Sequence, residues 1–408
     1  MARSHRVWSG FILLLAALVL AGCIEEIPQS TGVADTSSLA SSPSREEPEP
    51  QADPVDELLA GMTLEEKVGQ LFLIRPESLC VELTPQQVHD AADFGVTTWT
   101  EEMTERLAEY PAGGIVLFGK NLSNPDQLSA MMAQIEKAGE IPLMVGVDEE
   151  GGSVARLANS AGFDLPQFEQ MAEIGARGDV EEARQLGGTI GAYLHQYGFA
   201  LDFAPVADLW TNPQNSVIGS RSFGSDPALV SEMVLAVIDG LHEEGVLSCI
   251  KHFPGHGDTR GDSHDGYVLL ERSWEELLER ELIPFVDNLD NTDLVMVAHI
   301  LLPQITGDGL PASLSAELIT GRLRGELGYD GLVVTDSLAM RAITDQYTSA
   351  QAAVLAFEAG ADLLLMPQDY TAAFDGVLDA VRRGEVDESR LDESVLRILR
   401  AKQKCDLL

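Results

Sequence analysis

Eight short runs of apolar and β-branched residues, alternating with longer segments of helical periodicity, follow residue 54. Most of these runs are almost continuously apolar, as is typical of parallel strands covered on both faces. The pattern predicts an α/β fold, a single (β/α)8 TIM-type barrel. The predicted strands are Leu71–Ile74, Gly114–Phe118, Leu143–Asp148, Leu201–Ala207, Leu247–Phe253, Leu294–His299, Leu332–Thr335 and Asp362–Met366.

The segments between these runs carry apolar residues at helical spacing. An open, doubly wound sheet is the alternative arrangement for such a chain. It is less well supported, because no glycine-rich dinucleotide-binding motif follows the first predicted strand. The clearest predicted helices are Asn124–Ala138, Val180–Tyr197, Pro227–Glu244, Trp274–Leu289, Ala316–Leu327 and Ser349–Ala359.

Polar residues stand at the C-terminal ends of several predicted strands. In a barrel of this kind that end carries the active site, whereas the opposite end is structural. One such residue could be a satisfied structural group, but their number predicts a polar pocket at this rim. The residues are Asp148, Asp208, Lys251, His252, His299 and Asp336.

The N-terminus has the features of an export signal. Arg3 and Arg6 precede an apolar run over residues 11–21 that is shorter than the ~20 residues needed to span a bilayer, so residues 1–22 are predicted to be a signal peptide. The run ends in the sequence LAGC, which resembles a bacterial lipobox with Cys23 as the lipidated residue. We therefore expect a protein of the cell envelope, held outside the cytoplasm by acyl chains in a membrane. The alternative is an ordinary signal peptide followed by a free cysteine.

Composition separates a tether from a folded body. Residues 23–53, after the cysteine itself, are rich in Ser, Pro and Glu and predict a disordered tether, while residues 54–408 form the predicted catalytic barrel. The chain has 26 basic and 66 acidic residues and a net charge of −40, which argues against nucleic acid as a partner because the phosphate backbone would be repelled. The other cysteines show no spacing typical of a disulfide framework or a metal site.

Five motifs occur in a fixed order along the predicted barrel. They are VDEEGG from Val147, FAPVAD from Phe203, RSFG from Arg221, KHFPGHGDT from Lys251 with DSH close behind it, and VVTDS from Val333. Together they resemble glycoside hydrolase family 3, in particular its β-N-acetylglucosaminidase branch. The similarity runs from about residue 56 to about residue 404.

The resemblance implies a retaining mechanism, which needs a carboxylate nucleophile and a second group that acts as acid and then as base. It implies that Asp336 is the nucleophile, that His264 is the acid/base and that Asp262 orients His264. An imidazole titrates near pH 6.5, and a neighbouring carboxylate raises this pKa, so the histidine can donate a proton at neutral pH. Without the resemblance, Asp336 could be a helix N-cap, and DSH a surface loop. No metal or organic cofactor is implied.

The resemblance also implies a set of sugar-binding residues. His256 is expected to brace the PGHG turn, and His299 is either a pocket wall or a supporting residue. Two positions depart from the family's common VDQEGGRV pattern, with Glu149 in place of Gln and Ser153 in place of Arg. An extended segment, residues 76–111, is a candidate lid or partner surface. The implied substrate-binding residues are Asp148, Arg156, Arg221, Lys251 and His252.

We therefore expect an exo-β-N-acetylglucosaminidase that removes terminal N-acetylglucosamine from peptidoglycan fragments or, alternatively, from chitin oligosaccharides. A β-glucosidase-type or a phosphorolytic exo-glycosidase of the same family is a second interpretation, as is an amino-sugar-binding lipoprotein without activity. Substrate-assisted catalysis through the acetamido group is a mechanistic alternative. The expected partners are a carbohydrate and, through the lipid anchor, a membrane. A monomer is favoured, although the sequence does not fix the oligomeric state.

Overall fold

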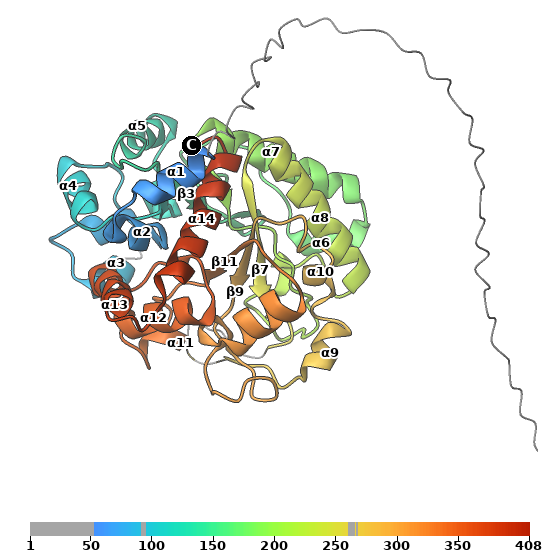
Figure 1. Ribbon diagram of the computed structural model, residues 1–408. Helices are drawn as coiled ribbons and strands as arrows, with labels where there is room; N and C mark the ends of the chain where they lie inside the picture. Colours follow the sequence, from blue (N-terminus) through green and yellow to red (C-terminus); the bar gives the residue numbers. More distant parts are fainter. Residues whose placement is uncertain (1–52, 91–94, 260–265, 267) are drawn as a thin grey trace, which may run out of the picture. The chain divides into compact units, whose positions relative to one another are not determined.

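The eight predicted strands form one parallel sheet in the computed structural model, which describes residues 53–90, 95–259, 266 and 268–408. The strands lie in the order β11-β9-β7-β6-β3-β2-β1-β12, with helices packed around them (Figure 1). Their bounds are β1 (Phe72–Ile74), β2 (Gly114–Val116), β3 (Met144–Val147), β6 (Leu201–Asp202), β7 (Leu247–Phe253), β9 (Leu294–Val297), β11 (Leu332–Thr335) and β12 (Leu364–Leu365).

The sheet closes on itself where its two ends meet. β1 pairs with β12 through Phe72 and Leu364. Val334 in β11 forms a parallel bridge with Leu363, the residue directly before β12. The N–H of Leu363 donates to the carbonyl of Val333 at 3.0 Å, which completes the ring of strands. The (β/α)8 prediction is confirmed, and the open, doubly wound alternative is wrong.

Side chains with good capping geometry fix where several helices begin. Asn124, Asp179 and Asp226 each accept a hydrogen bond from the first turn of the helix that follows. No helix among the described residues is long and apolar enough to cross a membrane. The helices are α1 (Pro54–Gly61), α2 (Leu64–Gln70), α3 (Pro85–Asp90), α4 (Glu101–Glu109), α5 (Pro125–Ile135), α6 (Met171–Arg177), α7 (Val180–Gln196), α8 (Pro227–Glu243), α9 (Trp274–Leu278), α10 (Ile283–Val286), α11 (Arg341–Thr344), α12 (Ser349–Ala359), α13 (Tyr370–Arg382) and α14 (Glu388–Lys404).

Two predicted helices differ from the structure. The segment expected as one helix over Trp274–Leu289 is broken into α9 and α10, because Pro284 has no N–H and its ring disfavours a continuous helix through this region. The segment expected over Ala316–Leu327 is a π-helix, η5 (Glu317–Glu326), in which the N–H of Gly321 donates to the carbonyl of Ala316 at 2.9 Å.

The described part of segment 76–111 is packed against the body by a buried carboxylate. It contains η1 (Pro76–Leu79), α3 and α4. Glu77 in η1 is fully buried, and its Oε1 accepts hydrogen bonds from the N–H of Val96 at 2.9 Å and from the side-chain amide of Asn121 at 2.7 Å. The bond to Val96 links two parts of the segment, and the bond to Asn121 ties the segment to η2 (Gly119–Asn121), which follows β2. Its role as a lid or partner surface stays a prediction.

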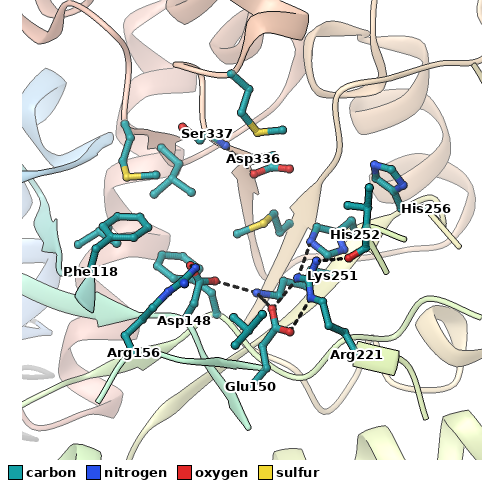
Figure 2. A pocket seen from close by; sticks show the side chains of 18 of the residues that line it. Phe118, Asp148, Glu150, Arg156, Arg221, Lys251, His252, His256, Asp336 and Ser337 are labelled. Atoms are coloured by element: carbon teal, nitrogen blue, oxygen red, sulfur yellow. Dashed lines mark hydrogen bonds and ion pairs between the residues drawn. The ribbon is translucent and has the colours of Figure 1, made fainter. Parts of the chain in front are cut away.

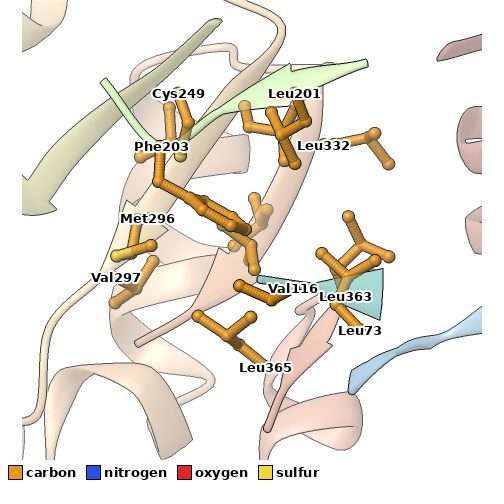
Figure 3. Close-up of a cluster of buried hydrophobic side chains, with 14 of the residues drawn as sticks. Leu73, Val116, Leu201, Phe203, Cys249, Met296, Val297, Leu332, Leu363 and Leu365 are labelled. Atoms are coloured by element: carbon orange, nitrogen blue, oxygen red, sulfur yellow. The ribbon is translucent and has the colours of Figure 1, made fainter. Parts of the chain in front are cut away.

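Apolar side chains fill the interior of the barrel (Figure 3). Leu201 in β6 and Phe203 directly after it point inward, so Asp202 between them points outward, toward Tyr193 of α7. Cys249 is fully buried in this core, and burial raises the pKa of its thiol, so it packs as a small apolar residue. A leucine buried in this way contributes about 1.5–3 kcal/mol to stability.

A polar network lies at the opposite end of the barrel, where α14 packs. Asp362, which precedes β12, is fully buried and accepts hydrogen bonds from the N–H of Val333 at 2.9 Å and from the hydroxyl of Ser394 at 2.6 Å. Arg324 forms an ion pair with the same carboxylate. Because these partners come from η5, β11 and α14, the network joins the last helix to the strands.

Lys402 in α14 is a fully buried amine that has no ion pair with a carboxylate of the described residues. Its Nζ donates to Oε1 of Gln70 at 2.6 Å, and burial lowers its pKa from the ordinary value to about 7. The unfolded chain holds this proton up to about pH 10, whereas the folded chain releases it near pH 7. The contribution of Lys402 to the free energy of unfolding therefore rises as the pH rises between these two values.

Replacing Lys402 by methionine is expected to stabilise the protein at pH 7. The gain is about 1–2 kcal/mol, because the cost of the buried amine disappears while the hydrogen bond to Gln70 is lost. The dependence of stability on pH between 7 and 9 should also become flatter. Urea denaturation at both pH values measures this, with Lys404→Met as the control, since Lys404 is half-exposed and pairs with Asp293. Equal destabilisation at both pH values would contradict the prediction.

Candidate active site

A pocket of about 510 Å³ lies at the C-terminal ends of the strands (Figure 2). It is lined by six residues that the sequence had singled out: Asp148, Arg156, Arg221, Lys251, His252 and Asp336. Among the described candidates, all those proposed to touch sugar therefore converge on one cavity. This arrangement agrees with the rule that barrel active sites occupy this face.

Four charged side chains form a continuous ladder across the floor of the pocket. Lys251 Nζ lies 2.8 Å from Asp148 Oδ1 and 2.5 Å from Glu150 Oε1. Arg221 makes a bidentate pair with Glu150, with distances of 2.8 Å from Nε and 2.6 Å from Nη2. Lys251 and Glu150 are buried, so the ladder depends on mutual neutralisation.

The electrostatics of the ladder keep its members charged. Burial alone would raise the pKa of Glu150, but Arg221 and Lys251 lower it to well below its ordinary value. Burial would lower the pKa of Lys251, but Asp148 and Glu150 raise it above its ordinary value. The floor of the pocket therefore presents ionised hydrogen-bonding groups with little net charge.

Glu150 is a pocket residue that the sequence analysis missed. It stands two positions after Asp148, and side chains two apart in an extended segment point to the same side. That spacing could have identified it. Arg221 and Lys251 were expected only to recognise the sugar, whereas in the structure each also has a partner within the protein.

Asp208 fixes the orientation of His252. It is fully buried, and its Oδ2 lies 2.6 Å from His252 Nδ1, which directs the proton on Nδ1 toward the carboxylate. Burial would raise the pKa of Asp208, but His252 lowers it below its ordinary value. His252 Nε2 is then directed toward Arg221 Nη2, at 3.5 Å.

Asp336 follows β11 directly and lines the pocket on the side opposite the ladder (Figure 2). Its main-chain N–H donates to the carbonyl of Val297 at 2.9 Å, and its Oδ1 accepts the N–H of Ser337 at 2.7 Å. The next described helix, α11, has Met340 at its N-cap, so Asp336 does not cap it. The helix-cap interpretation of Asp336 is therefore excluded.

The two other histidines of the rim support the main chain. His299 is fully buried, with Nδ1 2.7 Å from Ser313 Oγ and Nε2 2.9 Å from the carbonyl of Ser337, so it braces the backbone beside Asp336. His256 donates its main-chain N–H to Asp208 at 2.6 Å and its Nδ1 lies 2.8 Å from the hydroxyl of Thr259. It therefore braces the turn, as expected, but it also lines the pocket.

Phe118 gives the pocket an aromatic wall that was not foreseen from the sequence. The guanidinium of Arg75 stacks on its ring at 4.4 Å from the centroid, and that of Arg156 lies 5.6 Å from the same centroid. Arg156 Nη2 is 3.6 Å from Asp148 Oδ2, a longer contact than those in the ladder. Ser153, which stands where the family's common motif has Arg, is exposed and also lines the pocket.

Three residues to which the sequence analysis gives a role lie outside the described residues: the acid/base candidate His264, its partner Asp262 and the lipidation candidate Cys23. Their roles stay predictions. Within the ranges that the structure describes, no group of three or more His, Cys, Asp or Glu residues is arranged to hold a metal ion.

Comparison with known proteins agrees with this geometry. Residues 63–401 match the model of the glycosyl hydrolase family 3 N-terminal domain. β-Hexosaminidase LpqI of Mycobacterium tuberculosis is 35% identical, covering 82% of this chain and 84% of that protein. β-Hexosaminidase A of Pseudoalteromonas piscicida is 31% identical over 84% of this chain, which spans 61% of that protein.

A solved structure is similar over the same region. The family 3 β-N-acetylglucosaminidase of Paenibacillus sp. str. FPU-7 has a TM-score of 0.76 and 38% identity, covering 85% of this chain and 63% of that one. The spaced motifs, the closed barrel and a family match over most of the sequence thus lead to one conclusion: the chain belongs to glycoside hydrolase family 3.

Proposed function

We propose that the chain is a retaining exo-β-N-acetylglucosaminidase that hydrolyses terminal β-linked N-acetylglucosamine. The observation that carries the proposal is the position of Asp336, which faces a ladder of ionised hydrogen-bonding groups across one pocket. The ladder has little net charge and many donors and acceptors, which suits a neutral sugar with several hydroxyl groups. The names of the relatives, β-hexosaminidase and β-N-acetylglucosaminidase, support the choice of sugar.

In the proposed mechanism, Asp336 attacks the anomeric carbon and forms a covalent glycosyl-enzyme. His264, oriented by Asp262, protonates the leaving oxygen in this first step. In the second step His264 removes a proton from water, which attacks the anomeric carbon and releases Asp336. His264 gives its proton to the leaving group in the first step and regains one from water in the second, so the reaction consumes only the glycoside and water.

The remaining residues would bind and orient the sugar. Asp148 would accept hydrogen bonds from hydroxyl groups, and Arg156 and Arg221 would donate to hydroxyl or acetamido oxygens. Lys251, with His252 beside it, would complete this set. Because Glu150 and Asp208 hold three of these side chains in the free protein, the site is organised before the sugar arrives.

The proposed setting is the cell envelope. Cys23 would carry the lipid anchor, residues 24–53 would act as a tether, and the barrel would act as a monomer outside the cytoplasm. Peptidoglycan fragments with terminal N-acetylglucosamine are the proposed natural substrates, because they occur where such an anchor would hold the enzyme. Chitin oligosaccharides are the alternative carbohydrate.

The test of the proposed function is hydrolysis by residues 24–408 of 4-nitrophenyl β-N-acetylglucosaminide beside the matching β-glucoside. We expect a preference for the acetamido sugar of about 10⁴–10⁵ in kcat/KM, the range for a site that hydrogen-bonds the distinguishing group. Proton NMR of the first product should show the β-anomer. Preference for the glucoside, or an α-anomer, would reject the proposal.

Two added measurements separate the alternatives. With inorganic phosphate present, formation of a sugar 1-phosphate in place of free sugar would identify a phosphorolytic enzyme. Release of N-acetylglucosamine from a disaccharide of N-acetylglucosamine and N-acetylmuramic acid, compared with release from chitobiose, ranks the natural substrates. Binding of N-acetylglucosamine with no turnover of any of these compounds would indicate an amino-sugar-binding lipoprotein.

A further inference from the structure

Glu149 lies between two pocket residues but points away from the pocket. It begins β4 (Glu149–Gly151), which forms an antiparallel hairpin with β5 (Val154–Ala155). Asp148 and Glu150 on either side line the pocket, whereas Glu149 is fully buried and faces α7. This is also one of the two positions where the chain departs from the family's common motif.

Both carboxylate oxygens of Glu149 bind the end of its own loop. Oε2 accepts the main-chain N–H of Leu157 at 2.9 Å, and Oε1 accepts that of Ala158 at 2.9 Å. Oε1 also accepts the hydroxyl proton of Tyr193, in α7, at 2.8 Å. The Glu149 side chain therefore joins the two ends of the loop, from Glu149 to Leu157 and Ala158.

Arg156 directly precedes Leu157, so it lies at the end of the loop that Glu149 holds. Its guanidinium lies 3.6 Å from Asp148 and 5.6 Å from the centroid of the Phe118 ring, so its charged contact is looser than the ladder pairs of 2.5–2.8 Å. The main-chain N–H of Arg156 also stabilises the carboxylate of Glu149. The direction of Arg156 is therefore set by its main chain more than by its side-chain partners.

We propose that Glu149 is a positioning residue that holds Arg156 in place for the sugar by clamping the N–H groups of Leu157 and Ala158. The inference rests on the proposed function, because it takes Arg156 to contact the sugar. It assigns a specific task to the glutamate that this chain has in place of glutamine.

A carboxylate fits this task better than an amide. The two main-chain N–H groups each face a different oxygen, and both need an acceptor. Glutamine has one acceptor oxygen and one NH2 donor. In either orientation of a glutamine amide, the NH2 would face one of the two N–H groups, so one bond of the clamp would be lost.

The neighbouring Asp202 supplies a matched control. It is fully buried and its Oδ1 accepts the N–H of Glu149 at 2.9 Å, while its Oδ2 has no hydrogen-bond partner among the described residues. Burial raises the pKa of both carboxyls, that of Asp202 well above its ordinary value. Of these two carboxyls, Glu149 accepts more hydrogen bonds, so Asp202 is the one that is protonated. Asparagine is neutral and keeps the acceptor oxygen, so it can replace a protonated Asp202.

The experiment is a double-mutant cycle on kcat/KM for 4-nitrophenyl β-N-acetylglucosaminide, using the full mature chain. Glu149→Gln is expected to lower kcat/KM about tenfold, mainly through KM, as for the loss of one hydrogen bond. In the Arg156→Ala background the same substitution should change kcat/KM less than twofold. Asp202→Asn should leave the wild-type value within twofold.

The result that overturns the proposal is a tenfold loss in both backgrounds, since Glu149 would then act on the whole fold and not through Arg156. No loss in the wild-type background would overturn it as well. If Glu149→Gln does not fold, Tyr193→Phe removes one of the three bonds to Glu149, and its smaller loss should also vanish in the Arg156→Ala background.

A measurement that does not depend on enzyme activity separates the test of the clamp from the test of the proposed function. Hydrogen exchange at the amides of Leu157 and Ala158 should be faster in Glu149→Gln and unchanged in Asp202→Asn. An inactive wild-type protein would defeat the proposed function while leaving this exchange result open to measurement. Unchanged exchange in Glu149→Gln would reject the clamp itself.

Discussion

Replacing Asp336 by asparagine is expected to lower kcat for β-N-acetylglucosaminide hydrolysis by about 10⁴-fold or more, the range for loss of a nucleophile. The amide cannot form the glycosyl-enzyme, whereas the ladder of Asp148, Lys251, Glu150 and Arg221 is left intact across the pocket. KM should therefore change little. Steady-state kinetics with purified protein measures both constants.

The control for this substitution is Asp345→Asn, because Asp345 is exposed in the turn after α11, close in sequence to Asp336 but outside the pocket. It should retain full activity. A fluorinated N-acetylglucosamine analogue with a good leaving group should label the wild-type enzyme at the peptide that carries Asp336. A covalent label elsewhere would refute the assignment, and turnover without any trapped adduct would favour substrate-assisted catalysis.

Replacing Lys251 by methionine should have the largest effect on stability, about 3 kcal/mol, together with a large loss of activity. The substitution removes the cation that lies 2.8 Å from Asp148 and 2.5 Å from Glu150, and leaves buried negative charge with fewer partners. Arg221 still neutralises part of the charge on Glu150. The free energy of unfolding from urea denaturation measures the loss.

The double variant Lys251→Met, Glu150→Gln distinguishes charge from packing. Removing the uncompensated carboxylate should recover part of the lost stability without restoring activity, because the ladder is still broken. If the double variant is less stable by the sum of the two single effects, the ladder does not act as one unit. A single variant as stable as the wild type would also contradict this account.

The sequence predicted the positions of the strands better than their ends. Continuous apolar runs located all eight strands, because only buried parallel strands tolerate such runs. The strand expected over Leu201–Ala207 stops at Asp202, since Pro205 cannot donate a hydrogen bond, and Val206 rejoins the sheet only as a bridge to Lys251. A hydrophobic pattern does not register the absence of one backbone N–H, so it does not show where a proline interrupts the pairing of a strand.

The pocket was predictable to the extent that its residues follow strands. The rule that the C-terminal strand ends carry the active site found Asp148 and Asp336, which directly follow β3 and β11, and Lys251, which lies near the C-terminal end of β7. The ion pairs of the ladder were not predictable, since Arg221 and Glu150 are 71 residues apart in the sequence, Lys251 and Asp148 are 103 apart, and they meet only when the barrel closes. The roles proposed for His264 and Asp262 rest on the family resemblance.

Closure of the barrel has a consequence for how the protein is made. Phe72 pairs with Leu364, and Val334 with Leu363, so the ring of strands cannot be completed until nearly the whole polypeptide has been synthesised. Parallel pairing between such distant segments is slow to form. The ring is therefore completed by a step that joins segments from the two ends of the barrel sequence, and a chain truncated before β12 would lack the strand that pairs with the free edge of β1.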